Sequence, residues 1–312
     1  MRKVFLRNQI AMPNQFINPA IKCIIFYCIL LLVGCHSHPE VESTVYSPTY
    51  SPDSSHTHNI IIGMPAQFMN DAFDPFIQLI NRKKVGITVK VVMCQSYKDY
   101  NEKMRNGFFD IVFANPADAL NIMNNGYSVF GKLSRDDLYR AVIITRKDSN
   151  IKTIADLKNG SISFPGPSAF AGTMLPLYFF YQQGLNVNQD IKPQYVASQE
   201  STFYNVFLGK SVAAGCWIMP WKHFQITNPD IASKLCVKWE TPALISSAMM
   251  ARNNLETLYL GKFKKILFTL QENPEGRKLL ESIGLGNFIA ATNNTYDPVK
   301  EFLKKYHSVI HL

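Results

Sequence analysis

From residue 59 onward, the chain alternates short β-branched runs with segments of helical periodicity. The expected strands of the first half are residues 59–65, 87–94 and 110–116, and the expected helices are residues 68–82, 97–106 and 117–125. Strands that alternate with helices predict βαβ units, in which helices cover a mainly parallel sheet. The pattern therefore predicts an α/β fold.

A second α/β series starts at residue 141. The expected strands are residues 141–146, 161–167, 193–198 and 212–218, and the expected helices are residues 151–158, 168–184 with a kink at Pro176, and 202–208. Residues 237–252 are expected to return through strands to the first series, where the helical segments 255–283 and 298–306 close that half.

The two series predict two lobes, one formed by residues 59–140 and 238–312 and the other by residues 141–237. Two α/β lobes joined by crossing strands leave a cleft at the carboxyl ends of the strands. Open α/β sheets bind their ligands at that edge. The residues that follow the expected strands are therefore the candidates for a binding site.

Residues 1–34 have the features of an export signal. Four cations and no acid precede the apolar stretch CIIFYCILLLV at residues 23–33. This stretch is too short to cross a hydrocarbon core of about 30 Å, but it is typical of a signal-peptide core. It ends in LVGC, which is similar to a bacterial lipobox and predicts that Cys35 is lipidated and anchors the protein to a membrane. A plain secretory signal with an incidental cysteine is the alternative.

Residues 35–58 are rich in Ser, Thr, Pro and His and are predicted to be a flexible tether. The histidines of this segment permit a weak metal-site interpretation, but incidental histidines in a solvated linker are the simpler one, so no metal site is predicted. The formal charge of +9 becomes +5 without the four cations of the signal. This mild excess does not predict nucleic-acid binding.

The first candidate segment of the cleft is GPSAFAGT at residues 166–173, between an expected strand and helix. A helix N-terminus offers free N–H groups and the positive end of the helix dipole to an anion. Small residues allow an oxyanion to approach, and Ser168 and Thr173 can donate from their hydroxyls. The alternative is that Ser168 only caps its helix.

The second segment, SQEST at residues 198–202, is another strand-to-helix junction. Gln199 and Ser201 can donate to an oxyanion, and Glu200 can accept a hydrogen from a protonated one or meet an amine. Ordinary helix capping is the alternative. The third segment is FANP, where Asn115 is a potential donor or simply part of a turn.

Tyr97 and Trp217 are candidate walls of the cleft, although aromatic residues at such places more often belong to the core. His223 is a lone histidine, which usually has a structural role. No GxSxG, HExxH or GxxxxGK[ST] motif is present, so the sequence predicts neither an enzyme nor a cofactor. Three cysteines beyond the signal allow one disulfide without implying it.

Four segments occur in a familiar order: FDIVFANPADALNIMNNGYSVFGK, AVIITRKDSNIKTIADLKNGSISFPGPSAFAGTMLP, YVASQESTFYNVFLGKSVAAGCWIMPWKHF and WETPALISSAMMARNNL. The series resembles the phosphate, phosphite and phosphonate substrate-binding proteins of bacterial ABC transporters. SFPGPSAFAGTMLP and SQESTFYNVFLGK are its most specific parts. The resemblance covers about residues 60–306 and implies a two-lobed clamshell of the type II periplasmic-binding-protein fold, which closes around its ligand by a hinge motion.

The resemblance implies that a phosphorus oxyanion is captured between the lobes and delivered to an ABC permease with its ATPase. The implied ligand contacts are Ser168 with the amides of Ala169 and Phe170, the side chains of Gln199, Glu200 and Ser201, and Tyr97 and Asn115 from the first lobe. Family members commonly carry a Ser-Thr-Ser-Gly-like loop and a histidine at the places of SAFAG and Gln199. Fewer hydroxyls and no imidazole favour a small inorganic oxyanion.

A lipobox and a tether before such a domain are typical of the lipoprotein members of this family. The expected location is therefore the periplasm or cell envelope. A ligand-sensing subunit coupled to signalling, or a binder of an unrelated small organic ligand, remains an alternative on the same fold.

Overall fold

The computed structural model describes residues 57–64, 70–94, 96–284 and 286–312. These residues belong to one compact unit. The expected signal peptide, Cys35 and most of the expected tether lie outside the described residues. In the part of the chain that is described, no helix is both long enough and apolar enough to cross a membrane.

The first of two sheets has six strands in the order β11-β4-β10-β3-β1-β2. Its strands are β1 (His58–Met64), β2 (Ile87–Met93), β3 (Ile111–Ala114), β4 (Tyr127–Leu133), β10 (Ala248–Arg252) and β11 (Phe288–Ala290). β1 is parallel to β2 and β3, whereas β10, β4 and β11 pair antiparallel. The helices that accompany this sheet are α2 (Asn70–Arg82), α3 (Tyr97–Arg105), α4 (Pro116–Met123), α10 (Thr257–Phe268) and α11 (Pro274–Ile283).

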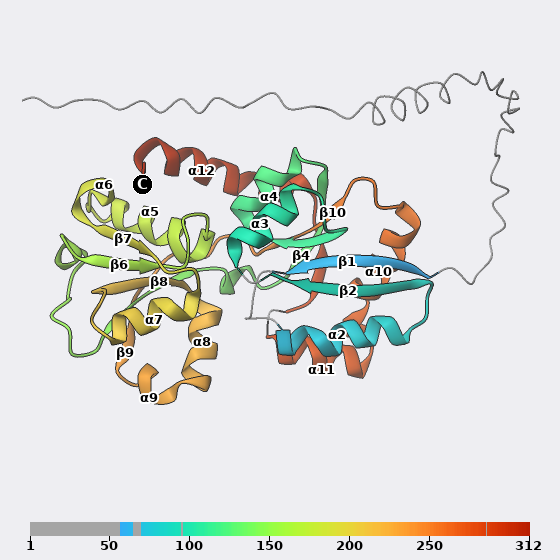
Figure 1. Cartoon of the computed structure of the whole chain (residues 1–312), viewed down its shortest axis with the longest axis horizontal. Coiled ribbons are helices and arrows are strands. Elements are labelled where there is room, and N and C mark those ends of the chain that lie inside the picture. Colours follow the sequence, from blue (N-terminus) through green and yellow to red (C-terminus); the bar gives the residue numbers. More distant parts are fainter. Residues whose placement is uncertain (1–56, 65–69, 95, 285) are drawn as a thin grey trace, which may run out of the picture. The chain divides into compact units, whose positions relative to one another are not determined.

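The second sheet has five strands in the order β7-β6-β8-β5-β9. They are β5 (Ala141–Arg146), β6 (Ser161–Phe164), β7 (Lys192–Tyr195), β8 (Ala213–Trp217) and β9 (Leu235–Glu240). Its helices are α5 (Leu175–Gln182), α6 (Val187–Asp190), α7 (Gln199–Phe207), α8 (Ile218–Thr227) and α9 (Pro229–Ala232). Figure 1 shows these helices around the second sheet and confirms the expected α/β architecture. The expected lobe boundary after residue 237 falls inside β9.

The C-terminal helix α12 (Asp297–Val309) contributes to both halves of the unit (Figure 1). Val299 is buried in the cluster that contains α4, and Tyr306 belongs to the core of the second sheet. Asn188 of α6 also donates to the carbonyl of Val309 at 2.8 Å. This helix, which was expected to close the first half, thus also packs into the core of the second sheet.

The expected helix over residues 168–184 is divided. Residues Phe170–Met174 form a π-type turn, and α5 starts at Leu175. Pro176 is therefore not a kink, because it stands in the first turn of α5, where its missing N–H has no intrahelical partner to lose. The helix expected from residue 202 begins earlier, at Gln199, because Ser198 caps it.

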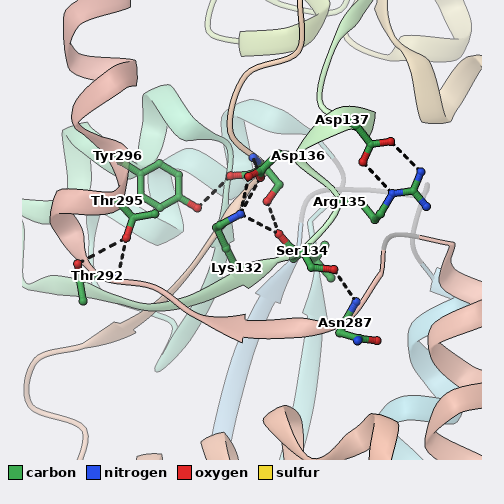
Figure 2. A network of polar contacts seen from close by, with 11 residues as sticks. Lys132, Ser134, Arg135, Asp136, Asp137, Asn287, Thr292, Thr295 and Tyr296 are labelled. Atoms are coloured by element: carbon green, nitrogen blue, oxygen red, sulfur yellow. Dashed lines mark hydrogen bonds and ion pairs between the residues drawn. The ribbon is translucent and has the colours of Figure 1, made fainter.

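The segment between β4 and β5 and the segment between β9 and β10 connect the sheets. A polar network holds these two segments together (Figure 2). Lys132, at 7% exposure, donates to both oxygens of Asp136 at 2.7 and 2.8 Å. Asp136 Oδ1 in turn accepts from the backbone N–H of Ser246 at 2.8 Å, and the Ser246 hydroxyl donates to the carbonyl of Leu133 at 2.7 Å. Tyr296 closes the network by donating to the Ser246 carbonyl at 2.9 Å. The network therefore holds the two connecting segments in place at the point where the chain passes between the sheets.

One glycine allows the second sheet to approach the π-type turn closely. A Cβ on Gly215 of β8 would lie 2.6 Å from the carbonyl oxygen of Gly172 and 2.8 Å from the ring of Phe164. Backbone on one side and a buried ring on the other leave little room for adjustment.

We expect Gly215→Ala to lower the free energy of unfolding by about 1–3 kcal/mol, because the added methyl overpacks the core. Denaturant unfolding curves measure the change. Gly261→Ala is the matched control, since nothing lies within 4 Å of its added Cβ on helix α10. Equal stabilities of the two variants would contradict the close approach.

Candidate functional site

A cavity of about 640 Å³ opens where strands of both sheets end. Met64 and Phe113 line it from the first sheet and Trp217 from the second. Four helices begin at or beside it, namely α3, α4, α7 and α8. The cavity thus lies at the place where open α/β sheets bind ligands, as expected from the sequence.

The turn over residues 169–172 forms one wall of the cavity. Ala169 does line it, but its N–H donates to the carbonyl of Gly166 at 3.1 Å, and the Thr173 hydroxyl donates to the same oxygen at 2.7 Å. Neither group is therefore available as the donor expected from the sequence. The next N–H groups, beginning with Phe170, stand at the start of a helical segment, where no intrahelical acceptor exists for them.

Ser168 is half-buried and does not line the cavity. Its carbonyl oxygen accepts from Asn115 Nδ2 of the first half at 3.4 Å. Ser168 also does not cap the following helix, since the capping residue is Ala169. The structure thus places a backbone contact where the sequence suggested a hydroxyl donor.

Residues 198–201 form a neighbouring part of the cavity wall. Ser198 caps α7 by accepting from the Ser201 N–H at 3.1 Å, and its hydroxyl donates to the Ser201 oxygen at 2.8 Å. Gln199 Oε1 accepts from the Trp217 N–H at 3.2 Å, which fixes the amide and leaves its Nε2 as a donor beside Gly172. Glu200 also lines the cavity and is exposed.

Trp217 lines the cavity, as expected, and its indole N–H donates to the carbonyl of Leu138 at 2.7 Å. This bond leaves the indole ring as an apolar wall beside Tyr139, whose ring centroid lies 5.4 Å away. Tyr97 is the first residue of α3, and its side chain lies outside the described part of the structure.

Asn115 lines the cavity, but its amide already serves the fold. Its Oδ1 accepts from the N–H groups of Ala117 and Asp118 at 3.0 and 3.1 Å, which caps α4. Its Nδ2 donates to Asp118 Oδ2 and to the Ser168 carbonyl, so the amide links the two lobes. Of the two interpretations that the sequence left open, the structure supports the capping turn.

Asp118 is a cavity residue that the sequence did not single out. Its side chain is only 3% exposed, and burial raises the pKa of its carboxyl to about 6, although the charge of Arg105 and the hydrogen bond from Asn115 lower it. The sequence signal was an acid three residues after a capping Asn, which is ordinary at a helix start. Only the packing of α4 shows that this acid is buried.

The cavity carries no lysine or arginine among the described residues that line it. Positive potential comes instead from helix N-termini, each equivalent to about half an elementary charge. The neutral donors Gln199 and Ser201 add to it. Oriented neutral donors and helix dipoles in a partly desolvated cavity favour an anion, and each counts for more than it would in water.

Most of the aromatic lining of the cavity was also missed by sequence reasoning. Apart from Trp217, its rings are Tyr100, Phe113, Tyr139, Phe170, Phe203 and Phe224.

The described residues show no group of three or more His, Cys, Asp or Glu that could hold a metal ion. Cys94, Cys216 and Cys236 are free thiols.

The raised pKa of Asp118 predicts how the ligand-free protein responds to pH. The folded protein binds this proton more tightly than the unfolded chain, so the free energy of unfolding falls as the pH rises from about 4 through 6. Relative to the unchanged protein, Asp118→Asn should gain up to about 3 kcal/mol between pH 4 and pH 7.

Urea unfolding curves at several pH values measure that difference. Replacement of the exposed Asp74 by Asn controls for the loss of one carboxylate. A difference between Asp118→Asn and the unchanged protein that stays constant over this range would contradict a destabilised buried carboxylate.

Comparison with known proteins identifies the family. A profile of the periplasmic substrate-binding proteins of phosphonate ABC transporters matches residues 63–296. The phosphonates-binding periplasmic protein of Escherichia coli is 23% identical over 269 residues, which are 83% of this chain and 79% of that protein. The probable phosphite-binding protein PhnD1 of Prochlorococcus marinus is 22% identical over 286 residues, which are 86% of this chain and 96% of that protein.

The solved structure of PhnD1 in complex with methylphosphonate superposes with a TM-score of 0.71 at 20% identity, covering 81% of this chain and 99% of that one. This likeness confirms the expected clamshell of type II periplasmic-binding proteins. Together with the profile match, it shows that the chain belongs to the family of periplasmic substrate-binding proteins of phosphonate ABC transporters.

Proposed function

We propose that the cavity captures a phosphorus oxyanion, such as phosphate, phosphite or a phosphonate, which the protein then delivers to an ABC permease and its ATPase. The observation that carries the proposal is the meeting of helix starts at one cavity, α3 and α4 from the first half and the turn at Phe170 and α7 from the second. The anion would lie between the N–H groups that begin at Phe170 and the donors of Gln199 and Ser201. The binding would involve no catalysis.

The size of the cavity favours a ligand with an organic substituent over the bare inorganic anion that the sequence favoured. Its volume of about 640 Å³ lies within the roughly 300–1,000 Å³ typical of sites for small organic molecules. Its lining includes both hydrogen-bond donors and aromatic rings such as Tyr139 and Trp217. An anionic head with an apolar tail matches both kinds of lining residue, so an organic phosphonate is the ligand we propose first.

Calorimetric and thermal-shift titrations with phosphate, phosphite, methylphosphonate, 2-aminoethylphosphonate and sulfate test the function. A ligand at 100 times its Kd should add about 2.7 kcal/mol to the free energy of unfolding. We expect saturable binding of at least one phosphorus anion and weakening of about tenfold or more in Gln199→Ala, which removes one donor.

Gln189→Ala is the control, because Gln189 is an exposed glutamine on α6 away from the cavity. Its binding constants should equal those of the unchanged protein. If protein shown to be free of carried-over ligand bound none of the phosphorus anions, the proposed function would be wrong.

We also propose that the mature protein is anchored to a membrane by lipid on Cys35. The LVGC ending of the apolar stretch and the Ser- and Pro-rich segment after it support this proposal. Anchoring that is stable requires more than one acyl chain, which lipobox processing supplies.

When the full chain is expressed in bacterial cells, Cys35→Ser should abolish incorporation of labelled palmitate. It should also move the protein from the membrane to the soluble fraction. Cys28→Ala, in the apolar stretch before the lipobox, should keep both the label and the membrane association. Labelling that persists in Cys35→Ser would refute the anchor.

A further inference from the structure

Asp118 stands out in an anion-binding cavity because it is itself an acid. It is 3% exposed and lines the same cavity as the turn at residues 169–172. Asn115 Nδ2 bridges Asp118 Oδ2 and the carbonyl of Ser168, so the carboxyl group lies close to the start of that turn. A carboxylate and a fully ionised oxyanion repel each other in a desolvated cavity. Binding of a fully ionised oxyanion beside an ionised Asp118 is therefore unfavourable.

One oxygen of this carboxyl group remains for a ligand. Asp118 Oδ2 accepts from Asn115, which fixes the orientation of the side chain. Among the described residues, no hydrogen bond occupies Oδ1. A buried carboxyl of a cavity residue, with one oxygen held and no described partner on the other, can accept a hydrogen bond, or donate one when it is protonated.

We propose that Asp118 is a specificity-determining residue, which shares one proton with the bound phosphorus oxyanion and so disfavours anions that bring no proton. The inference rests on the proposed function, since it concerns the same ligand in the same cavity.

The proton can reach the complex by two routes. A phosphorus oxyanion titrates near neutrality, so its monoanion can enter with a P–OH group that donates to the Asp118 carboxylate. When the dianion enters, Asp118 takes up a proton from solvent and donates it to a ligand oxygen. Both routes give the same complex with one shared proton, and no covalent bond to phosphorus changes. A sulfonate is fully ionised at neutral pH, so its binding requires Asp118 to be protonated from solvent.

The ionisable groups around Asp118 are consistent with this role. Arg105 on α3 acts on the carboxyl through its charge, while burial outweighs it and leaves the pKa at about 6. α12 adds the apolar Val299 and Phe302 to the core that it shares with α4. The ionisable groups on the other elements packed against α4 are engaged elsewhere: Lys132 with Asp136, Arg252 with Asp110, and Tyr127 and Tyr296 with backbone carbonyls. The charged residues of α12 are exposed, namely Asp297, Lys300, Glu301, Lys304 and Lys305, and so is His307. Glu200 and His223 line the cavity and are the rival proton carriers.

Calorimetry in buffers of different ionisation enthalpy counts the protons taken up on binding. With methylphosphonate at a pH where it is the dianion, we expect uptake of about one proton per ligand in the unchanged protein and almost none in Asp118→Asn. Methanesulfonate should bind the unchanged protein at least tenfold more weakly at pH 7.5 than at pH 5. In Asp118→Asn its affinity should be nearly independent of pH and at least tenfold higher at pH 7.5.

Glu200→Gln and His223→Gln test the two rival proton carriers, and both variants should retain the proton uptake on ligand binding. Asp74→Asn, on the exposed face of α2, should leave every value unchanged. Loss of uptake in either rival variant, with uptake retained in Asp118→Asn, would overturn the assignment.

The unchanged protein alone also tests the proposal if Asp118→Asn does not fold. Methylphosphonate binding without proton uptake, together with methanesulfonate binding that ignores pH, would refute it. Failure of the unchanged protein to bind any phosphorus anion would instead refute the proposed function.

Discussion

The cavity depends on one constraint: the two sheets are connected through segments that hydrogen-bond to each other. Asp136 accepts hydrogen bonds from the Lys132 side chain of β4 and from the backbone N–H of Ser246, which lies between β9 and β10 (Figure 2). A nearly buried lysine is costly unless it is paired, and here its partner also organises the crossing chain. Because both segments are held at this point, the strand ends of the two sheets face a common cavity, and the helix starts face it too.

That cavity has an unusual electrostatic character. Its described lining offers helix starts and neutral donors but no cation, while it includes one buried acid. Attraction for an anion is therefore moderate and depends on dehydration, since helix dipoles and amides gain strength when water leaves. Selectivity in such a cavity depends on where protons and dipoles lie rather than on a salt bridge.

The sequence predicted the α/β class, most of the elements and two of the segments that line the cavity, because these follow from hydrophobic periodicity and from polar residues after strands. It missed β4, whose run YSVFGKL includes a buried lysine that only Asp136 explains, and β11, which is too short to show a pattern. It named Ser168 for its hydroxyl, but the backbone turns that residue so that its carbonyl faces Asn115. The burial of Asp118 results from tertiary packing, which no local pattern records.

The helix α12 adds a mechanical consequence to this arrangement. Its first half is embedded in a core with α4, and its last turn is embedded in the core of the second sheet (Figure 1). A helix that is packed into the cores of both halves resists their separation more than their rotation about the helix axis. Packed interiors deform little, so a large separation of the two halves would break the contacts of Val299 or Tyr306. The easiest motion of the two halves is therefore a twist about an axis close to α12.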